Sequence, residues 1–213
     1  MTVREEQTPM TTTPHRAVLP VILLAQFVIP LSIAGTAVGL PSISVELGAE
    51  PVLLQGIVNG FNITFAVCTL LWGAVADRIG SGRAFSLGVL AVVLGSILSA
   101  ASPSLLVLDI ARVLAGVGSA AVITGATATI HSAFQGPARA RSFAAFGMVN
   151  GLGLAAGPSL SGVLIGLLGW RAVFVIHAVV LIAALAEGRD WPDWVPALLH
   201  GARIVEVNAR GLE

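Results

Sequence analysis

The sequence has little charge, no lysine and a single cysteine. Only 10% of its 213 residues are charged, whereas a soluble domain carries about 25%. All eleven basic residues are arginine, which excludes chemistry that depends on a Schiff-base or phosphate-binding lysine. Cys68 has no second cysteine, so an internal disulfide is excluded. The net charge of zero gives no reason to expect a nucleic-acid partner.

Sequence motifs of the common enzyme classes are also missing. We find no Walker A motif, no metal-ligand cluster and no G-x-G-x-x-G after a strand. Ser159 and Ser161 lie between glycines, but not at the G-x-S-x-G spacing of hydrolases. A membrane serine hydrolase with His177 as its base is an alternative that predicts labelling of these serines by a serine-reactive probe. We expect no enzyme, no cofactor and no metal site.

Long apolar runs are what the sequence does contain. Hydrophobic residues make up 56% of the chain, and about 20 apolar residues suffice for a helix to cross a bilayer. Nothing alternates with a period of two, as the strands of a membrane barrel do. The sequence therefore predicts an all-α membrane protein with six transmembrane helices in a bundle over residues 17–186. The expected spans are residues 17–40, 51–76, 84–101, 104–130, 142–168 and 169–186.

The ends of the chain differ from this bundle. The run 17–40 exceeds the roughly 7–15 apolar residues of a signal peptide, so we expect it to remain as the first span. Residues 1–16 are polar and rich in Thr and Pro, and predict a cytoplasmic tail. Residues 187–213 contain no run long enough to span, and predict a second cytoplasmic tail without a seventh helix.

The connections between the spans predict the orientation. One side carries Arg16, a turn with Arg78 and Arg83, and a loop with Arg139 and Arg141. The other side carries a loop over residues 42–50 with two glutamates, and Arg171 is its one arginine in a connection. Because arginine-rich connections stay in the cytoplasm, both termini are expected inside the cell.

A short charged turn joins the second and third spans. It contains Gly73, Asp77, Arg78, Gly80 and Arg83 at fixed offsets. Gly73 would allow helices to approach closely, Gly80 permits a tight turn, and Asp77 can bond a helix N-terminus or a nearby arginine. The alternative is an ordinary positively charged turn on the inner side of the membrane.

The fourth span contains two charges, Asp109 and Arg112, followed by Gly116 and Gly118. An arginine within a span costs at least about 2.5–3.5 kcal/mol, so it is a candidate functional residue. Asp109 and Arg112 are three residues apart and are therefore able to pair on one helix face. The alternative is that Arg112 extends along the helix to the membrane surface.

The fifth span is rich in glycine around a proline. Gly153, Gly157, Pro158 and Gly162 lie within ten residues, with Ser161 between them. Proline bends a helix, and small residues around the bend let a neighbouring helix pack into it. Packing alone is the alternative that needs no substrate.

These three motifs together resemble those of the major facilitator superfamily. The turn with Asp77 resembles the family's cytoplasmic loop between helices two and three, and Arg112 resembles its helix-four arginine. The stretch from Gly153 to Gly162 resembles the helix-five motif of drug:proton antiporters. In that branch the first helix often carries Asp and Asn, where this sequence has Ser32 and Ala37.

The resemblance implies a fold and a function. The fold is the N-terminal six-helix half of a transporter whose two halves enclose a midplane site. The function is secondary transport, with efflux of small amphipathic drug-like molecules from the plasma membrane driven by a proton gradient. Arg112, assisted by Asp109, would be the coupling or gating charge, while the loop motif forms an inner latch and the helix-five motif a seal. The candidate cavity-lining residues are Gln26, Asn59, Asn62 and His177.

One half of a transporter has nothing to move against. We therefore expect the chain to need a second half, from another chain or a homo-oligomer, and to be inactive as an isolated pump. The alternative is a non-transporting remnant or scaffold subunit. For His177, a hydrogen bond to a neighbouring helix is the alternative to a functional role.

Overall fold

A computed structural model describes residues 18–48 and 50–187, and within them the chain forms six α-helices and no strand. The predicted all-α class is therefore confirmed. The two predicted terminal tails lie outside the described residues, apart from Glu187. The helices are α1 (Val18–Leu47), α2 (Pro51–Ile79), α3 (Ser81–Ala100), α4 (Leu105–Ala133), α5 (Gly136–Leu168) and α6 (Trp170–Glu187).

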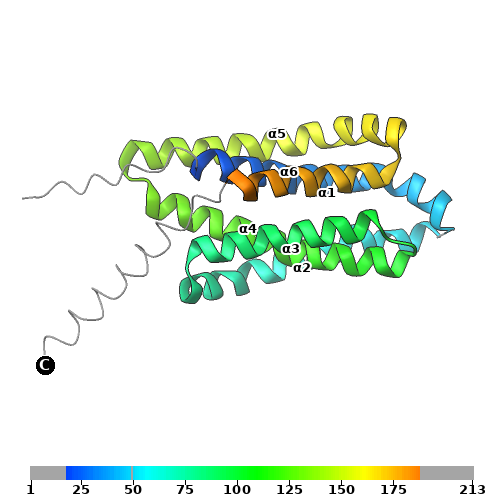
Figure 1. Cartoon of the computed structure of the whole chain (residues 1–213), viewed down its shortest axis with the longest axis horizontal. Coiled ribbons are helices and arrows are strands. Elements are labelled where there is room, and N and C mark those ends of the chain that lie inside the picture. Colours follow the sequence, from blue (N-terminus) through cyan, green and yellow to red (C-terminus); the bar gives the residue numbers. More distant parts are fainter. Residues whose placement is uncertain (1–17, 49, 188–213) are drawn as a thin grey trace, which may run out of the picture.

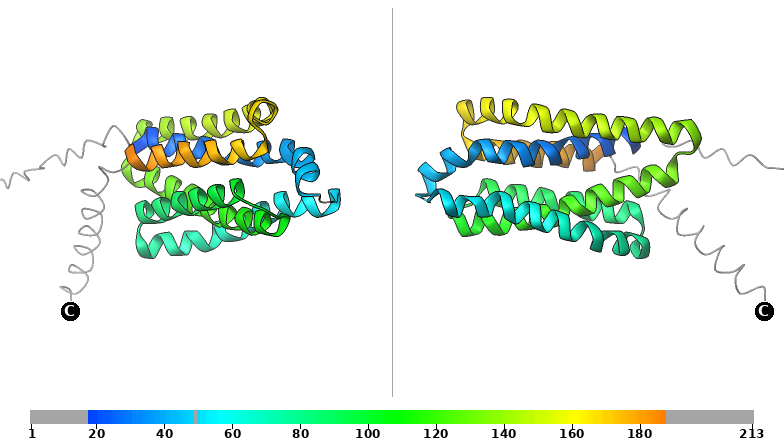
Figure 2. Two further views of the ribbon diagram at one scale, coloured as in Figure 1. Left: turned by 45° about the vertical axis from the view of Figure 1, so that its right-hand side comes forward. Right: turned by 180° about the vertical axis from the view of Figure 1, so that it is seen from behind.

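The helices lie side by side along one common axis, the horizontal axis of Figure 1, and form two groups of three. One group contains α1, α5 and α6, and the other contains α2, α3 and α4. The most extensive contacts are between α3 and α4, between α1 and α5 and between α2 and α4, while α3 and α6 join the two groups. The start of α1, the end of α6 and the α2–α3 turn lie at the same end of the bundle (Figure 2).

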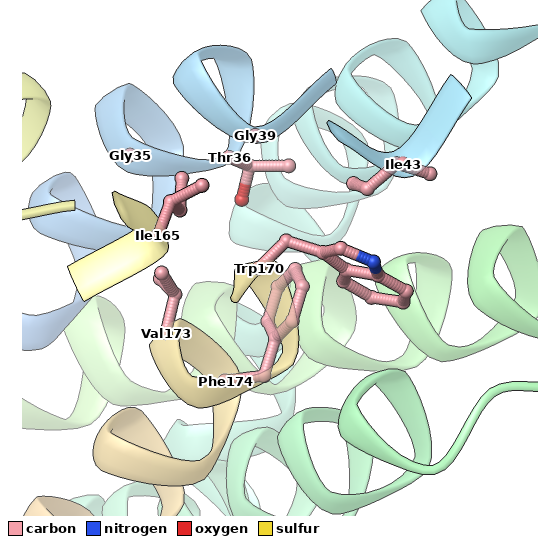
Figure 3. Close-up of a pocket in the computed structure, with 8 residues that line it drawn as sticks. All are labelled: Gly35, Thr36, Gly39, Ile43, Ile165, Trp170, Val173 and Phe174. Atoms are coloured by element: carbon pink, nitrogen blue, oxygen red, sulfur yellow. The ribbon is translucent and has the colours of Figure 1, made fainter. Parts of the chain in front are cut away.

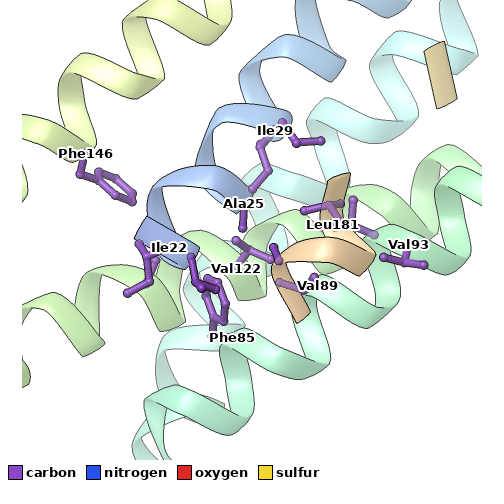
Figure 4. Packing of buried hydrophobic residues seen from close by; sticks show 14 of the residues in the cluster. Ile22, Ala25, Ile29, Phe85, Val89, Val93, Val122, Phe146 and Leu181 are labelled. Atoms are coloured by element: carbon purple, nitrogen blue, oxygen red, sulfur yellow. The ribbon is translucent and has the colours of Figure 1, made fainter. Parts of the chain in front are cut away.

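The hydrophobic core lies between these two groups. One cluster of buried side chains takes members from all six helices (Figure 4), among them Ile22, Phe85, Val122 and Leu181. A second cluster, with Ile43, Ile57, Leu108, Trp170 and Phe174 among its members, joins α1, α2, α4 and α6.

Five of the described helices, α1 to α5, are long and apolar enough to cross a membrane, and α6 is a shorter apolar helix. The six predicted helices are thus present, but the sixth does not reach the length of a full span within the described residues. Buried residues make up 61%, 50% and 56% of the apolar windows of α1, α3 and α4, but only 11% and 17% in α2 and α5. These two helices therefore present long apolar faces outward.

Two helices extend into predicted loops. The loop expected over residues 42–50 is helical as far as Leu47, because Pro41 removes only one backbone donor while Ile43 and Leu47 pack into the second cluster. The helix α5 begins at Gly136, with proline in its first turn. Arg139 and Arg141 consequently lie on the first turns of a helix and not in a loop.

The turns around two glycines are very short. Gly80 alone separates α2 from α3 and has φ +90°, and Gly169 alone separates α5 from α6 with φ +82°. A residue with a Cβ atom rarely adopts such a φ angle. The structure thus places Gly80 in the tight turn expected of it.

Candidate functional site

Arg112 of α4 lies in the interior of the bundle, with 2% of its surface exposed. Its Nη1 donates a hydrogen bond to Ser32 Oγ of α1 at 3.1 Å. Its Cζ lies 4.3 Å from the ring centroid of Phe61 on α2 and 5.7 Å from that of Phe174 on α6. The guanidinium therefore contacts three other helices and does not extend to the membrane surface. Its Nε has no hydrogen-bond partner among the described residues.

Asp109 does not form the expected pair with Arg112. The ion pair found among residues 18–48 and 50–187 involves other residues, and Asp109 Oδ1 has no hydrogen-bond partner there. Its carboxylate instead packs against α2, where a Cβ atom on Gly56 would lie 3.1 Å from each carboxylate oxygen. The pair fails to form because Arg112 points toward Ser32 and the aromatic rings, while Asp109 points toward Gly56.

The other polar residues predicted for a cavity do not lie together. Gln26 is buried, and its Nε2 donates a hydrogen bond to Asn150 Oδ1 of α5 at 2.9 Å. Asn59 and Asn62 are exposed on α2. His177 is buried on α6, and neither ring nitrogen has a partner among the described residues. His177 therefore forms no hydrogen bond to a neighbouring helix within the described part of the chain, contrary to one of the two interpretations.

The Gln26–Asn150 hydrogen bond gives a testable result. Asn150→Leu is expected to lower the melting temperature in detergent by about 2–6 °C, because it leaves a buried amide without its acceptor. Replacing Gln26 and Asn150 together by leucine should restore most of the loss, since no buried polar group is then left unpaired. Thermal melts followed by circular dichroism would show this. A double variant less stable than Asn150→Leu would contradict it.

The loop motif is placed at one end of the bundle and is exposed. Asp77, Arg78 and Arg83 are all exposed and form no ion pair within the described chain. Gly80 caps both flanking helices, and no side chain caps the start of α3. A Cβ on Gly73 would have no neighbour within 4 Å. Gly73 therefore does not serve close helix packing here, contrary to expectation.

The helix-five motif packs directly against α1. A Cβ on Gly153 would lie 2.7 Å from the carbonyl oxygen of Phe27, and one on Gly157 would lie 2.8 Å from Ala34 Cβ. Gly162 is looser, with its nearest such contact at 4.0 Å, and Pro158 is exposed within the helix. The absence of side chains at Gly153 and Gly157 thus lets α1 and α5 approach closely.

A further polar cluster, which sequence reasoning missed, joins the other end of α1 to α6. Trp170 Nε1 donates a hydrogen bond to Glu46 Oε2 at 2.6 Å, and Arg171 forms an ion pair with Glu46. Arg171 Nη2 also donates to the carbonyl oxygen of Ser102 at 2.9 Å, and its Cζ lies 4.3 Å from the Trp170 ring. In the sequence, Glu46 and Arg171 carry opposite charges on the same predicted side of the membrane, and Arg171 follows Trp170 directly. This was the signal that pointed to the cluster.

A small pocket lies next to this cluster, between α1, α5 and α6 (Figure 3). Its walls include Gly39, Ile43, Ile165, Trp170 and Phe174. Its cavity volume is about 10 Å³, room for about one water molecule and far less than the roughly 300–1,000 Å³ typical of sites for drug-sized ligands. The described part of the chain alone therefore offers no drug-sized site at this position.

Comparison with known proteins assigns the family. The family model described as Major Facilitator Superfamily matches residues 22–188. The puromycin resistance protein pur8 of Streptomyces alboniger is 36% identical over 175 residues, which cover 82% of this chain and 35% of that protein. The multidrug resistance protein B homolog of Mycobacterium tuberculosis is 32% identical over 178 residues, which cover 81% and 33% of the two chains.

A solved structure shows the same fold. The peptide transporter POT in complex with sulfate superimposes with a TM-score of 0.72 at 18% sequence identity. The match covers 89% of this chain and 44% of that one, and this chain spans about a third of the length of the two resistance proteins. The six helices thus correspond to about half of the transporter fold, and the chain belongs to the Major Facilitator Superfamily of membrane transporters.

Proposed function

We propose that this chain is the N-terminal half of a secondary transporter that exports small amphipathic drug-like molecules in exchange for protons. The observation that carries the proposal is Arg112, a charged side chain that is 2% exposed in a candidate span. A buried charge at such a position is costly and marks functional sites in membrane proteins. The relatives named for resistance to puromycin and to multiple drugs support the substrate class.

Arg112 and Asp109 form the proposed coupling site. Ser32, which stands where the drug-exporter branch often has Asp, accepts the hydrogen bond from Arg112. A serine hydroxyl does not ionise at neutral pH, so Asp109 is the carboxylate to which we assign proton binding. Its Oδ1 has no hydrogen-bond partner among the described residues and lies one turn of α4 from Arg112. Proton uptake at Asp109 would change the electric field at the guanidinium, and the arginine would then shift between partners.

The two remaining motifs are assigned to gating. Asp77, Arg78 and Arg83 are exposed without an ion-pair partner in the described chain, and a second half would supply the partners of this latch. The close contacts of Gly153 and Gly157 with α1 support a sealed α1–α5 contact, with Pro158 bending the helix and Gly162 continuing the motif. In this proposal the end of the bundle with the Gly80 turn faces the cytoplasm of a plasma-membrane protein.

A second six-helix half is part of the proposal. The outward faces of α2 and α5 are apolar and little buried, and the chain covers 35% of the length of pur8. Another chain or a homo-oligomer would provide the missing half. The same faces favour the alternative that the chain is a non-transporting scaffold subunit, which would bind a partner without moving a substrate.

Dye transport into everted membrane vesicles tests the proposal. We expect proton-driven accumulation of a fluorescent cationic dye when the chain is made together with the unmatched remainder of pur8, and none with the chain alone. A protonophore and the Arg112→Ala variant should each abolish accumulation. Transport by the chain alone would contradict the need for a second half if crosslinking finds a monomer, and would assign that half to a second copy of this chain if crosslinking finds a homo-oligomer. A crosslinked complex without transport would favour the scaffold alternative.

A further inference from the structure

Helix α6 presents three ring side chains on one buried face. Trp170, Phe174 and His177 are 3%, 2% and 2% exposed, at a spacing that places them on the same side of a helix. The Trp170 and Phe174 centroids are 6.1 Å apart, and those of Phe174 and His177 are 6.3 Å apart, both edge to face. Phe174 also lies 5.7 Å from the Cζ of Arg112. One rigid face of α6 therefore reaches from the Glu46 cluster to Arg112.

Glu46 holds the beginning of this face. Its carboxylate accepts the Trp170 indole hydrogen bond and forms the ion pair with Arg171, and Arg171 is itself bonded to the carbonyl oxygen of Ser102. The first turn of α6 is thus tied to the end of α1 and to the α3–α4 connection. Because Trp170 and Phe174 are four positions apart on one helix, a rotation of α6 moves both rings together.

Arg112 depends on its aromatic neighbours for its position. It donates one hydrogen bond, to Ser32, and its Nε has no partner in the described chain. No carboxylate among the described residues pairs with it. The rings of Phe61 and Phe174 therefore supply contacts that hold the guanidinium in place. A displacement of Phe174 removes one wall of this site.

We propose that Glu46 is a positioning residue for Arg112 and acts through Trp170 and Phe174 of α6. The importance of this link for transport rests on the coupling role proposed for Arg112, but the link itself is a property of the folded chain. Breaking the Glu46 cluster lets α6 turn, and the ring of Phe174 then leaves the guanidinium. A change in the Glu46 cluster at one end of the bundle would thereby change the surroundings of the buried Arg112.

A double-variant cycle on the full chain in detergent tests the link. Glu46 and Ser32 are fourteen residues apart on α1, about 21 Å at the helical rise, so Glu46→Gln and Ser32→Ala should be additive if no link exists. We expect their effects on the melting temperature to depart from additivity by about 2 °C or more. The departure should vanish when Phe174→Leu is present. Glu50→Gln is the matched control, because Glu50 precedes α2 and its side chain caps no helix.

Fluorescence of Trp170 gives a second readout that stability alone does not move. In a chain carrying Trp72→Phe, Trp191→Phe and Trp194→Phe, we expect Ser32→Ala to shift the emission of the remaining tryptophan. The added Phe174→Leu should remove that shift. Additive melting temperatures together with unchanged emission would overturn the link. Neither measurement involves transport, so a failure of dye export leaves this result standing, and a failure here leaves the export proposal standing.

Discussion

Arg112→Met is expected to abolish dye export and to raise the melting temperature in detergent by about 2–4 °C. The two effects oppose each other because the arginine is costly where it lies. An arginine within a span costs at least about 2.5–3.5 kcal/mol. One hydrogen bond to Ser32 and two aromatic contacts offset only part of this. Methionine fills a comparable volume without charge and adapts to irregular gaps.

The Arg112→Lys variant separates charge from shape. Lysine keeps the positive charge but lacks the planar guanidinium that lies over the Phe61 ring. We expect it to lose export without the gain in melting temperature. A fall of more than about 4 °C for Arg112→Met would instead show that the arginine holds the four helices together.

Gly118→Ala is expected to lower the melting temperature by about 4–8 °C. A Cβ at this position would lie 2.7 Å from the backbone nitrogen of Val92 and 2.8 Å from the carbonyl oxygen of Gly88. Both atoms belong to the backbone of α3, so no side chain is able to rotate away. The contact between α3 and α4 is among the most extensive in the bundle, and forcing these helices apart affects the whole core.

Gly147→Ala on α5 is the matched control for this experiment. A Cβ on Gly147 would have no neighbour within 4 Å, and alanine is about 1 kcal/mol better than glycine inside a helix. Its melting temperature should be unchanged or slightly higher. Equal losses at Gly118 and Gly147 would contradict the close packing of α3 and α4.

The helices and the family were predictable because both depend on local sequence. Apolar runs of span length and the turn around Gly80 indicate membrane helices without any knowledge of their packing. The sequence left two positions possible for the Arg112 side chain, the interior of the bundle and the membrane surface. The structure places it in the interior. The continuation of α1 past Pro41 was missed because it depends on the contacts of Ile43 with other helices.

Contacts between distant residues were the part that the sequence could not supply. Glu46 meets Trp170 and Arg171 across more than 120 residues, and no local pattern reports such a distance. The spacing of Asp109 and Arg112 favoured a pair, but the side-chain directions are set by Gly56, Ser32 and Phe61 on other helices. The glycines spaced four apart on α5 differ in their surroundings. A Cβ atom on Gly153 or Gly157 would contact α1, whereas one on Gly147 or Gly151 would have no neighbour within 4 Å.

The turns of one residue at Gly80 and Gly169 have a consequence for how the protein enters the membrane during synthesis. A turn of one residue is too short for α2 to lie in the bilayer while α3 is still outside it, because α3 begins where α2 ends. The same holds for α5 and α6. We therefore expect each pair to pass from the insertion machinery into lipid together, as a hairpin. Lengthening either turn would permit stepwise insertion and thereby release a constraint on the order of assembly.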